Sequence, residues 1–141
     1  MLGCSTGTYD SQRVLIVDDR MDVRALLQAR LGLASDIDVV GEAADGRAAL
    51  SLVNTLRPDI VILDLEMPVM SGQEAIPLIR DASPATKIVV YSGSRASEIS
   101  FSASAAPDAF VYKGGTLDEL MSTLRDLARV KNVEFPYMST A

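Results

Sequence analysis

Five short apolar runs, separated by longer segments of helical spacing, constrain the fold of this chain more than any other feature. The runs are rich in β-branched residues and lie at 14–17, 37–40, 60–63, 88–91 and 109–112. Runs of this length are typical of strands, and apolar residues at helical spacing between them are typical of helices. The alternation predicts five consecutive βα units, and therefore an α/β fold with a parallel sheet covered by helices.

The segments between and after the runs predict five helices. We expect them at 20–32, 46–56, 72–82, 95–105 and 116–130. Turn residues such as Asp45-Gly46 and Ser71-Gly72 mark their ends. The fourth segment is rich in serine and has few large apolar residues, so we expect it to be weakly buried and mobile.

The apolar content of the runs predicts which strands lie inside the sheet. The first, third and fourth runs are almost wholly apolar, which is typical of strands with helices over both faces. In the second run, Asp36 and Asp38 alternate with apolar residues. This pattern predicts that the second strand lies at an edge.

A length of 141 residues fits one domain. The residues are 48% hydrophobic and 23% charged, a composition that lies within the globular range and supports one sizeable core. Both ends lack a clear pattern, so we expect a folded domain at 12–130, an N-terminal tail at 1–11 and a C-terminal tail at 131–141.

The composition excludes several classes of function. The 13 basic and 19 acidic residues give a net charge of −6, and the basic residues are scattered, so we expect no direct contact with nucleic acid. The chain has no histidine and a single cysteine, which excludes a Cys/His zinc site and a Ser-His-Asp triad. No apolar run approaches the roughly 18 residues of a membrane span, so we expect a cytoplasmic protein with no membrane partner.

Polar side chains follow four of the predicted strands. Asp18 and Asp19 follow the first, Asp64 the third, Ser92 the fourth, and Lys113 the fifth. In a parallel sheet, the residues after the carboxyl ends of the strands line the ligand crevice. We therefore expect three carboxylates, a hydroxyl and an ammonium group at one edge of the sheet.

Three carboxylates in a small space repel one another unless a cation neutralises them. Magnesium prefers oxygen ligands and keeps several of its waters, so Asp18, Asp19 and Asp64 suit it better than they suit zinc or copper. A carboxylate can also act as a nucleophile toward a phosphoryl group whose charge is masked, here by the metal and Lys113. The Ser92 hydroxyl could donate to a phosphoryl oxygen.

Four motifs resemble signatures of the receiver domains of bacterial response regulators. They are Val14-Leu-Ile-Val-Asp-Asp19, Asp59-Ile-Val-Ile-Leu-Asp-Leu-Glu-Met-Pro68, Ser71-Gly72 and Tyr112-Lys113. Each is short, but their order and register with the βα units make the set specific, and the match covers about 12–130. The resemblance implies a flavodoxin-like (βα)5 three-layer sandwich with a five-stranded parallel sheet in the order 2-1-3-4-5.

The resemblance also implies roles for the residues of the acidic edge. Asp64 would be phosphorylated, Asp19 would bind magnesium directly, and Asp18 would bind it through water. The backbone carbonyl of Glu66 would be a further metal ligand, and its side chain would tune the lifetime of the phosphoryl group. Lys113 would pair with the phosphoryl oxygens.

A second set of roles concerns signalling. By resemblance, Ser92 would be the switch hydroxyl, and Phe110 would be an aromatic residue that rotates inward when this hydroxyl moves toward the phosphate. Core packing is the alternative role for Phe110. The coupling would be a population shift that alters a face formed by the fourth helix, the fifth strand and the fifth helix.

The resemblance implies a two-component switch rather than a metabolic enzyme. The domain would catalyse its own phosphotransfer from a histidine kinase or a histidine phosphotransfer protein, and its own slow dephosphorylation. Its output would be a downstream protein target or a fused output domain, and a homodimer formed on phosphorylation is left open. No helix-turn-helix follows residue 130, so we expect either a protein that acts through protein contacts or the receiver part of a longer chain.

Three alternative functions compete with the phosphorylated switch. The first is a pseudo-receiver, which has the same fold but acts as an interaction module without phosphorylation. A phosphatase with an aspartate nucleophile is disfavoured because such enzymes place that aspartate after the first strand, and Asp64 follows the third. A dinucleotide enzyme is disfavoured because the first turn, Asp18 to Met21, has no glycine.

Gly114 replaces a proline that is common in the family, so the resemblance does not decide whether the Lys113-Gly114 peptide is cis.

Overall fold

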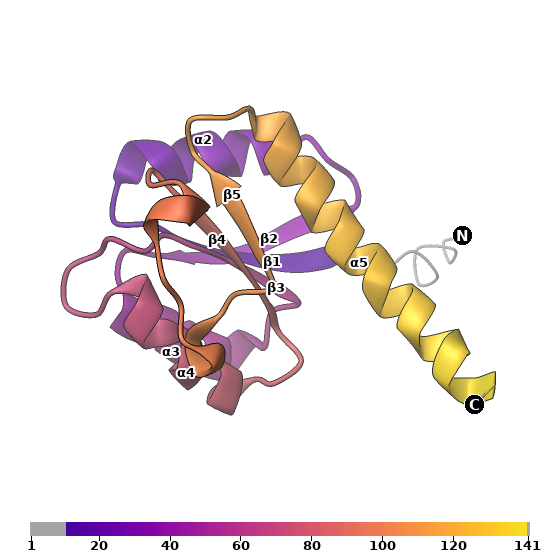
Figure 1. The fold of residues 1–141 in the computed structure, drawn as a ribbon. Helices are drawn as coiled ribbons and strands as arrows, with labels where there is room; N and C mark the ends of the chain where they lie inside the picture. Colours follow the sequence, from indigo (N-terminus) through magenta and orange to yellow (C-terminus); the bar gives the residue numbers. More distant parts are fainter. Residues whose placement is uncertain (1–10, 141) are drawn as a thin grey trace.

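A computed structural model describes residues 11–140 and contains the predicted five-stranded parallel sheet (Figure 1). The strand order is β2-β1-β3-β4-β5, so the flavodoxin-like topology implied by the resemblance is confirmed. The elements in chain order are β1 Gln12–Val17, α2 Met21–Leu31, β2 Ile37–Ala43, α3 Gly46–Leu56, β3 Ile60–Leu63, α4 Gly72–Ala82, β4 Lys87–Ser92, η1 Ala96–Glu98, η2 Ala103–Ala105, β5 Ala109–Tyr112 and α5 Leu117–Thr140.

Two hydrophobic clusters, one on each face of the sheet, form the core. Helices α2 and α5 cover one face and helices α3 and α4 cover the other (Figure 1). Successive residues of β1 alternate between the clusters, since Val14 and Ile16 pack toward α2 and α5, whereas Leu15 and Val17 pack toward α3 and α4. The last four residues of β1 and all of β3 are buried, because helices cover both sides of these central strands. The expected edge position of β2 is confirmed.

The predicted fourth helix at 95–105 is wrong. Two short 3-10 helices, η1 and η2, stand in its place. The segment is attached by Ile99 and Phe101, which pack against the cluster under α3 and α4, and by a 3.2 Å bond from Gln73 Nε2 to the carbonyl oxygen of Ser100. Its other side chains are small or polar, so no apolar stripe forces a regular helix onto the sheet.

The other predicted helices agree closely with the structure. The bounds of α3 and α4 are those expected, and α2 differs by one residue at each end. The backbone of α5 continues to Thr140, beyond the predicted end of the domain at 130. Of the predicted N-terminal tail, residues 1–10 lie outside the described part of the chain. Within that part, no helix has the length and apolarity to span a membrane.

The start of α4 fixes the loop that follows β3. The Ser71 side chain accepts from the N–H of Glu74, and the Glu74 side chain accepts from the N–H of Ser71, so the two form a capping box. Gly72 donates to the carbonyl oxygen of Leu65 at 2.9 Å. A Cβ atom at Gly72 would overlap the backbone carbonyl oxygen of Asp64. The absence of a side chain at Gly72 therefore lets the helix approach the end of β3.

We expect the substitution Gly72→Ala to destabilise the domain by about 1–3 kcal/mol, because the new methyl group must displace the backbone at Asp64. Urea denaturation would measure the loss. Gly93→Ala is the matched control, since a Cβ atom there would meet nothing within 4 Å. Equal stabilities of the two variants would show that the close approach at Gly72 is not required.

Candidate functional site

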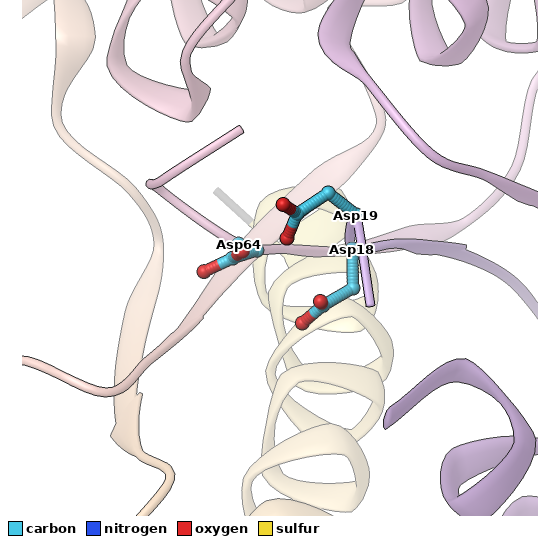
Figure 2. Close-up of side chains that lie close together, drawn as sticks. All are labelled: Asp18, Asp19 and Asp64. Carbon is cyan, nitrogen blue, oxygen red and sulfur yellow. The ribbon is translucent and has the colours of Figure 1, made fainter. Parts of the chain in front are cut away.

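Three carboxylates meet at the carboxyl ends of β1 and β3 (Figure 2). Asp18 and Asp19 follow β1, and Asp64 follows β3. The two strands are neighbours in the sheet and pair Val17 with Leu63, so the residues after this pair lie side by side. One oxygen from each carboxylate lies within 4.8 Å of the others.

Backbone hydrogen bonds hold two of these residues just beyond their strands. The N–H of Asp64 donates to the carbonyl oxygen of Val17 at 2.9 Å, and the N–H of Asp18 donates to that of Ala43 on β2 at 3.1 Å. Asp18 is only 2% exposed and Asp64 only 5%, whereas Asp19 faces solvent. The site therefore has two rigid, buried acids and one acid that faces solvent.

Lys113 joins the acids from the end of β5. Its Nζ lies 2.6 Å from Asp18 Oδ2 and 3.4 Å from Asp64 Oδ1. Its backbone N–H donates to the carbonyl oxygen of Ser92 at 2.7 Å. Burial lowers the pKa of Lys113, but the hydrogen bond with Asp18 and the charge of Asp64 outweigh burial and raise that pKa above its ordinary value. Lys113 is therefore the cation of the site.

One ammonium group does not neutralise three carboxylates. Burial, followed by the charge of Asp18, raises the pKa of Asp64 to about 6, although Lys113 and a backbone hydrogen bond from Glu66 act in the opposite direction. The described residues thus leave an excess of negative charge among oxygen ligands. A small divalent cation such as magnesium fits this set, because it prefers oxygen and needs few protein ligands.

The predicted switch residues Ser92 and Phe110 lie on β4 and β5, the two strands beyond β3 in the sheet. Ser92, at the end of β4, is buried, and its Oγ accepts from the N–H of Ser94 at 3.1 Å. Phe110, in β5, is half-buried and packs against the hydrophobic cluster on the α3 and α4 face of the sheet. Its ring meets Phe101 edge-on, with the ring centroids 6.3 Å apart. Ser92 therefore contacts Ser94, directly before the segment that replaces the predicted fourth helix, and Phe110 contacts Phe101 within that segment.

Arg24 and Tyr91 also support the cluster, and the sequence patterns did not indicate them. Arg24 Nη1 donates to the backbone carbonyl oxygen of Asp18 at 2.8 Å, and Arg24 Nε donates to Glu42 at 2.6 Å. The ring of Tyr91 lies 5.8 Å from Lys113 Nζ. One signal for Arg24 was available, because a cation in the first turn of a helix opposes the helix dipole and suggests another use.

Comparison with known sequences identifies a family and longer relatives that match this chain over part of their length. A family model described as the response regulator receiver domain matches residues 14–125. The chain is 34% identical to the nitrate/nitrite response regulator protein NarL of Escherichia coli K12 over 116 residues, which are 82% of this chain and 54% of that protein. It is 46% identical over 80 residues to a protein-glutamate methylesterase/protein-glutamine glutaminase of a Nocardioides strain, covering 57% of this chain and 22% of that protein. The chain thus spans about half, or less, of the length of these relatives.

Solved structures agree with the sequence comparison. A LuxR-family two-component response regulator from Aurantimonas has a TM-score of 0.76 at 30% identity, over 84% of this chain and 86% of that chain. The receiver domain of a NarL response regulator from Mycobacterium tuberculosis has a TM-score of 0.75 at 29% identity, over 85% and 98%. The response regulator domain of CheB from Thermotoga maritima has a TM-score of 0.70 at 28% identity, over 83% and 96%.

The raised pKa of Asp64 predicts a pH-dependent effect of Asp64→Asn in magnesium-free buffer. The folded pKa exceeds the unfolded value, so ionised Asp64 destabilises the fold above about pH 6, and this cost disappears below about pH 4. We expect Asp64→Asn to be more stable than the unsubstituted protein by on the order of 2 kcal/mol at pH 7.5, and equally stable near pH 4.

Urea denaturation across this pH range would measure the difference. Asp38→Asn, at an exposed position of β2, is the control and should show little pH-dependent gain. A gain for Asp64→Asn that stays constant with pH would contradict the proposed crowding of charge.

Proposed function

This chain belongs to the family of response regulator receiver domains, and we propose that it accepts a phosphoryl group on Asp64 in a magnesium-dependent reaction. The observation that carries the proposal is the convergence of three carboxylates and one lysine at the ends of β1, β3 and β5. Phosphoryl transfer needs mainly positioning and neutralisation of charge, and this arrangement supplies both.

Asp64 is the nucleophile in this proposal. Its carboxylate oxygen would form a bond to phosphorus while the bond from phosphorus to the donor nitrogen of a phosphohistidine breaks. The three acids Asp18, Asp19 and Asp64, together with the backbone carbonyl of Glu66, would hold magnesium. The ion, when bound, supplies positive charge that masks the phosphoryl oxygens.

Lys113 would change partners when the phosphoryl group arrives. Its Nζ now lies between Asp18 and Asp64, so a phosphoryl group on Asp64 would place new anionic oxygens within its reach. Charge-assisted hydrogen bonds of this kind are short and strong. Lys113 would therefore stabilise the phosphorylated state as well as the transfer.

Ser92 would connect the phosphoryl group to the signalling face. Its hydroxyl already accepts from the N–H of Ser94, and donating to a phosphoryl oxygen would pull it away from this contact. The segment 94–106 and Phe110, which packs on Phe101, would then rearrange together. This hypothesis replaces the predicted fourth helix of the signalling face with the segment that contains η1 and η2.

The face itself has a recognisable shape. An open groove of about 770 Å³ is lined by β5, the loop after it, the first turns of α5, and Arg95. Arg95 covers the ring of Tyr112 at 4.8 Å on one wall, and Phe110 contributes to the groove. A movement of the segment 94–106 would change this wall, so a downstream protein or a fused output domain could distinguish the two states.

Membership in the family supports a proposal for the donor and the output. We propose a histidine kinase or a histidine phosphotransfer protein as the donor and a cytoplasmic site of action. NarL, with which the chain shares 34% identity, is a response regulator about twice the length of the matched region. An output domain in the same polypeptide therefore belongs to this proposal, as does a homodimer formed on phosphorylation.

Acetyl phosphate with magnesium should add the mass of one phosphoryl group to the intact protein. We expect Asp64→Asn to abolish the addition, because it removes the nucleophile, and chelation of magnesium to prevent it. Intact-mass spectrometry at neutral pH measures both effects.

Asp38→Asn is the matched control, since it removes an exposed carboxylate of β2 and should leave the addition intact. If the unsubstituted protein gained no mass and bound no magnesium at millimolar concentration, the phosphorylation-independent interaction module would be the better description.

The proposed switch predicts a local change in hydrogen exchange. With beryllofluoride and magnesium, we expect the amides of 94–106 to exchange severalfold faster, because Ser92 leaves the N–H of Ser94. Ser92→Ala should bind beryllofluoride but lose much of this difference. Ser97→Ala, in the exposed η1, is the control. An equal response of Ser92→Ala and Ser97→Ala would exclude Ser92 as the link.

A further inference from the structure

Arg24 contacts the acidic cluster but has no role in the proposed phosphoryl transfer. From the first turn of α2, its Nη1 reaches the backbone carbonyl oxygen of Asp18 at 2.8 Å. Its Nε donates to Glu42 Oε1 at 2.6 Å, and Gln28 Nε2 donates to the other oxygen of Glu42 at 2.9 Å. The Arg24 side chain is only 15% exposed, compared with 41% for Glu42.

The position of Arg24 is costly unless it serves a purpose. A cation near the N-terminus of a helix faces the positive end of the helix dipole. Holding a long side chain in one conformation also costs conformational entropy. Arg24 offsets these costs with a forked set of hydrogen bonds to a carboxylate and a carbonyl, a geometry that lysine cannot reproduce.

The carbonyl that Arg24 binds belongs to the peptide between Asp18 and Asp19. A peptide is planar, so a hydrogen bond to its oxygen restrains the whole unit, including the Cα atom of Asp19. The N–H of Asp18 binds Ala43, and the N–H of Arg20, which belongs to the peptide after Asp19, donates to the Asp18 carboxylate at 2.9 Å. Arg24 therefore holds the peptide before Asp19, and the Arg20 contact holds the peptide after it.

Glu42 gives the Arg24 contact a rigid base. It lies on β2, directly before Ala43, whose carbonyl accepts from the N–H of Asp18. The ring of contacts thus runs from the end of β1 through Arg24 to β2 and back to β1. A ring that closes on a strand of the sheet transmits the rigidity of the sheet to the turn.

We propose that Arg24 is a positioning residue that orients Asp19 for magnesium binding, with its guanidinium group fixed by Glu42, which Gln28 holds in turn. The inference rests on the proposed function, because it assigns a metal to these acids. Substituting a residue that hydrogen-bonds to a metal ligand commonly weakens metal affinity about 10–100-fold. A purely electrostatic role makes the opposite prediction, since removing a positive charge near the site would tighten binding of a cation.

Arg24→Lys separates these explanations, because it keeps the charge and loses the fork. We expect the dissociation constant for magnesium to rise about tenfold in Arg24→Lys and at least as much in Arg24→Ala. Amide NMR shifts during titration of the phosphoryl-free protein with magnesium chloride would measure both constants. In both Arg24 variants, the rate of Asp64 phosphorylation should be closer to that of the unsubstituted protein at saturating magnesium than at low magnesium.

Arg30→Lys and Arg30→Ala are the matched controls. Arg30 lies on the same helix but pairs with Asp118, so both variants should bind magnesium within about twofold of the unsubstituted protein. Magnesium constants for the Arg24 variants equal to those of the controls, or tighter binding by Arg24→Ala, would overturn the proposal. If Arg24→Ala does not fold, Arg24→Lys decides the question alone.

The two hypotheses fail in different ways. If the unsubstituted protein binds magnesium but is not phosphorylated on Asp64, the proposed function is wrong, and the role of Arg24 is still judged from the magnesium constants. If the unsubstituted protein binds no magnesium, the metal site is wrong and the role of Arg24 is overturned with it.

Discussion

Repulsion between buried carboxylates is the constraint on which the site depends. The pairing of β1 with β3 places Asp18 and Asp64 side by side, and burial prevents water from screening them. Lys113 offsets part of this repulsion from β5, yet the pKa of Asp64 remains near 6. Ionisation of Asp64 therefore destabilises the fold, and the cation of the proposed function would offset this cost. The supporting contacts keep the acids from moving apart.

Much of the fold and the acidic cluster could be predicted because both follow from periodicity. Parallel strands end at the same edge, so residues directly after the apolar runs must meet, as Asp18, Asp64 and Lys113 do. Local turn chemistry at Ser71 and Gly72 likewise fixed the start of α4 to the residue. These features depend on short stretches of sequence and on the geometry of a sheet, which needs no knowledge of distant side chains.

The features that could not be predicted depend on contacts between distant side chains. Arg24 and Glu42 are 18 residues apart and meet only because α2 crosses back to β2. The segment 95–105 had helical spacing but lacked the apolar stripe that would decide between a helix and shorter turns. The conformation of this segment depends on how Ile99 and Phe101 pack against the core. Local helix propensity alone does not hold a short segment in a helix when few of its side chains are buried.

The weak attachment of that segment matters for the proposed switch. Reversing a two-state equilibrium from 1:99 to 99:1 takes about 5.5 kcal/mol of differential interaction. A hydrogen bond to a charged group contributes about 1.5–3 kcal/mol, so the proposed phosphoryl contacts of Ser92 and Lys113 would together supply an amount of that order. A regular helix packed along the sheet would add many buried contacts to the resisting side. The segment with η1 and η2 resists mainly through Ile99 and Phe101, so the same chemistry can move it.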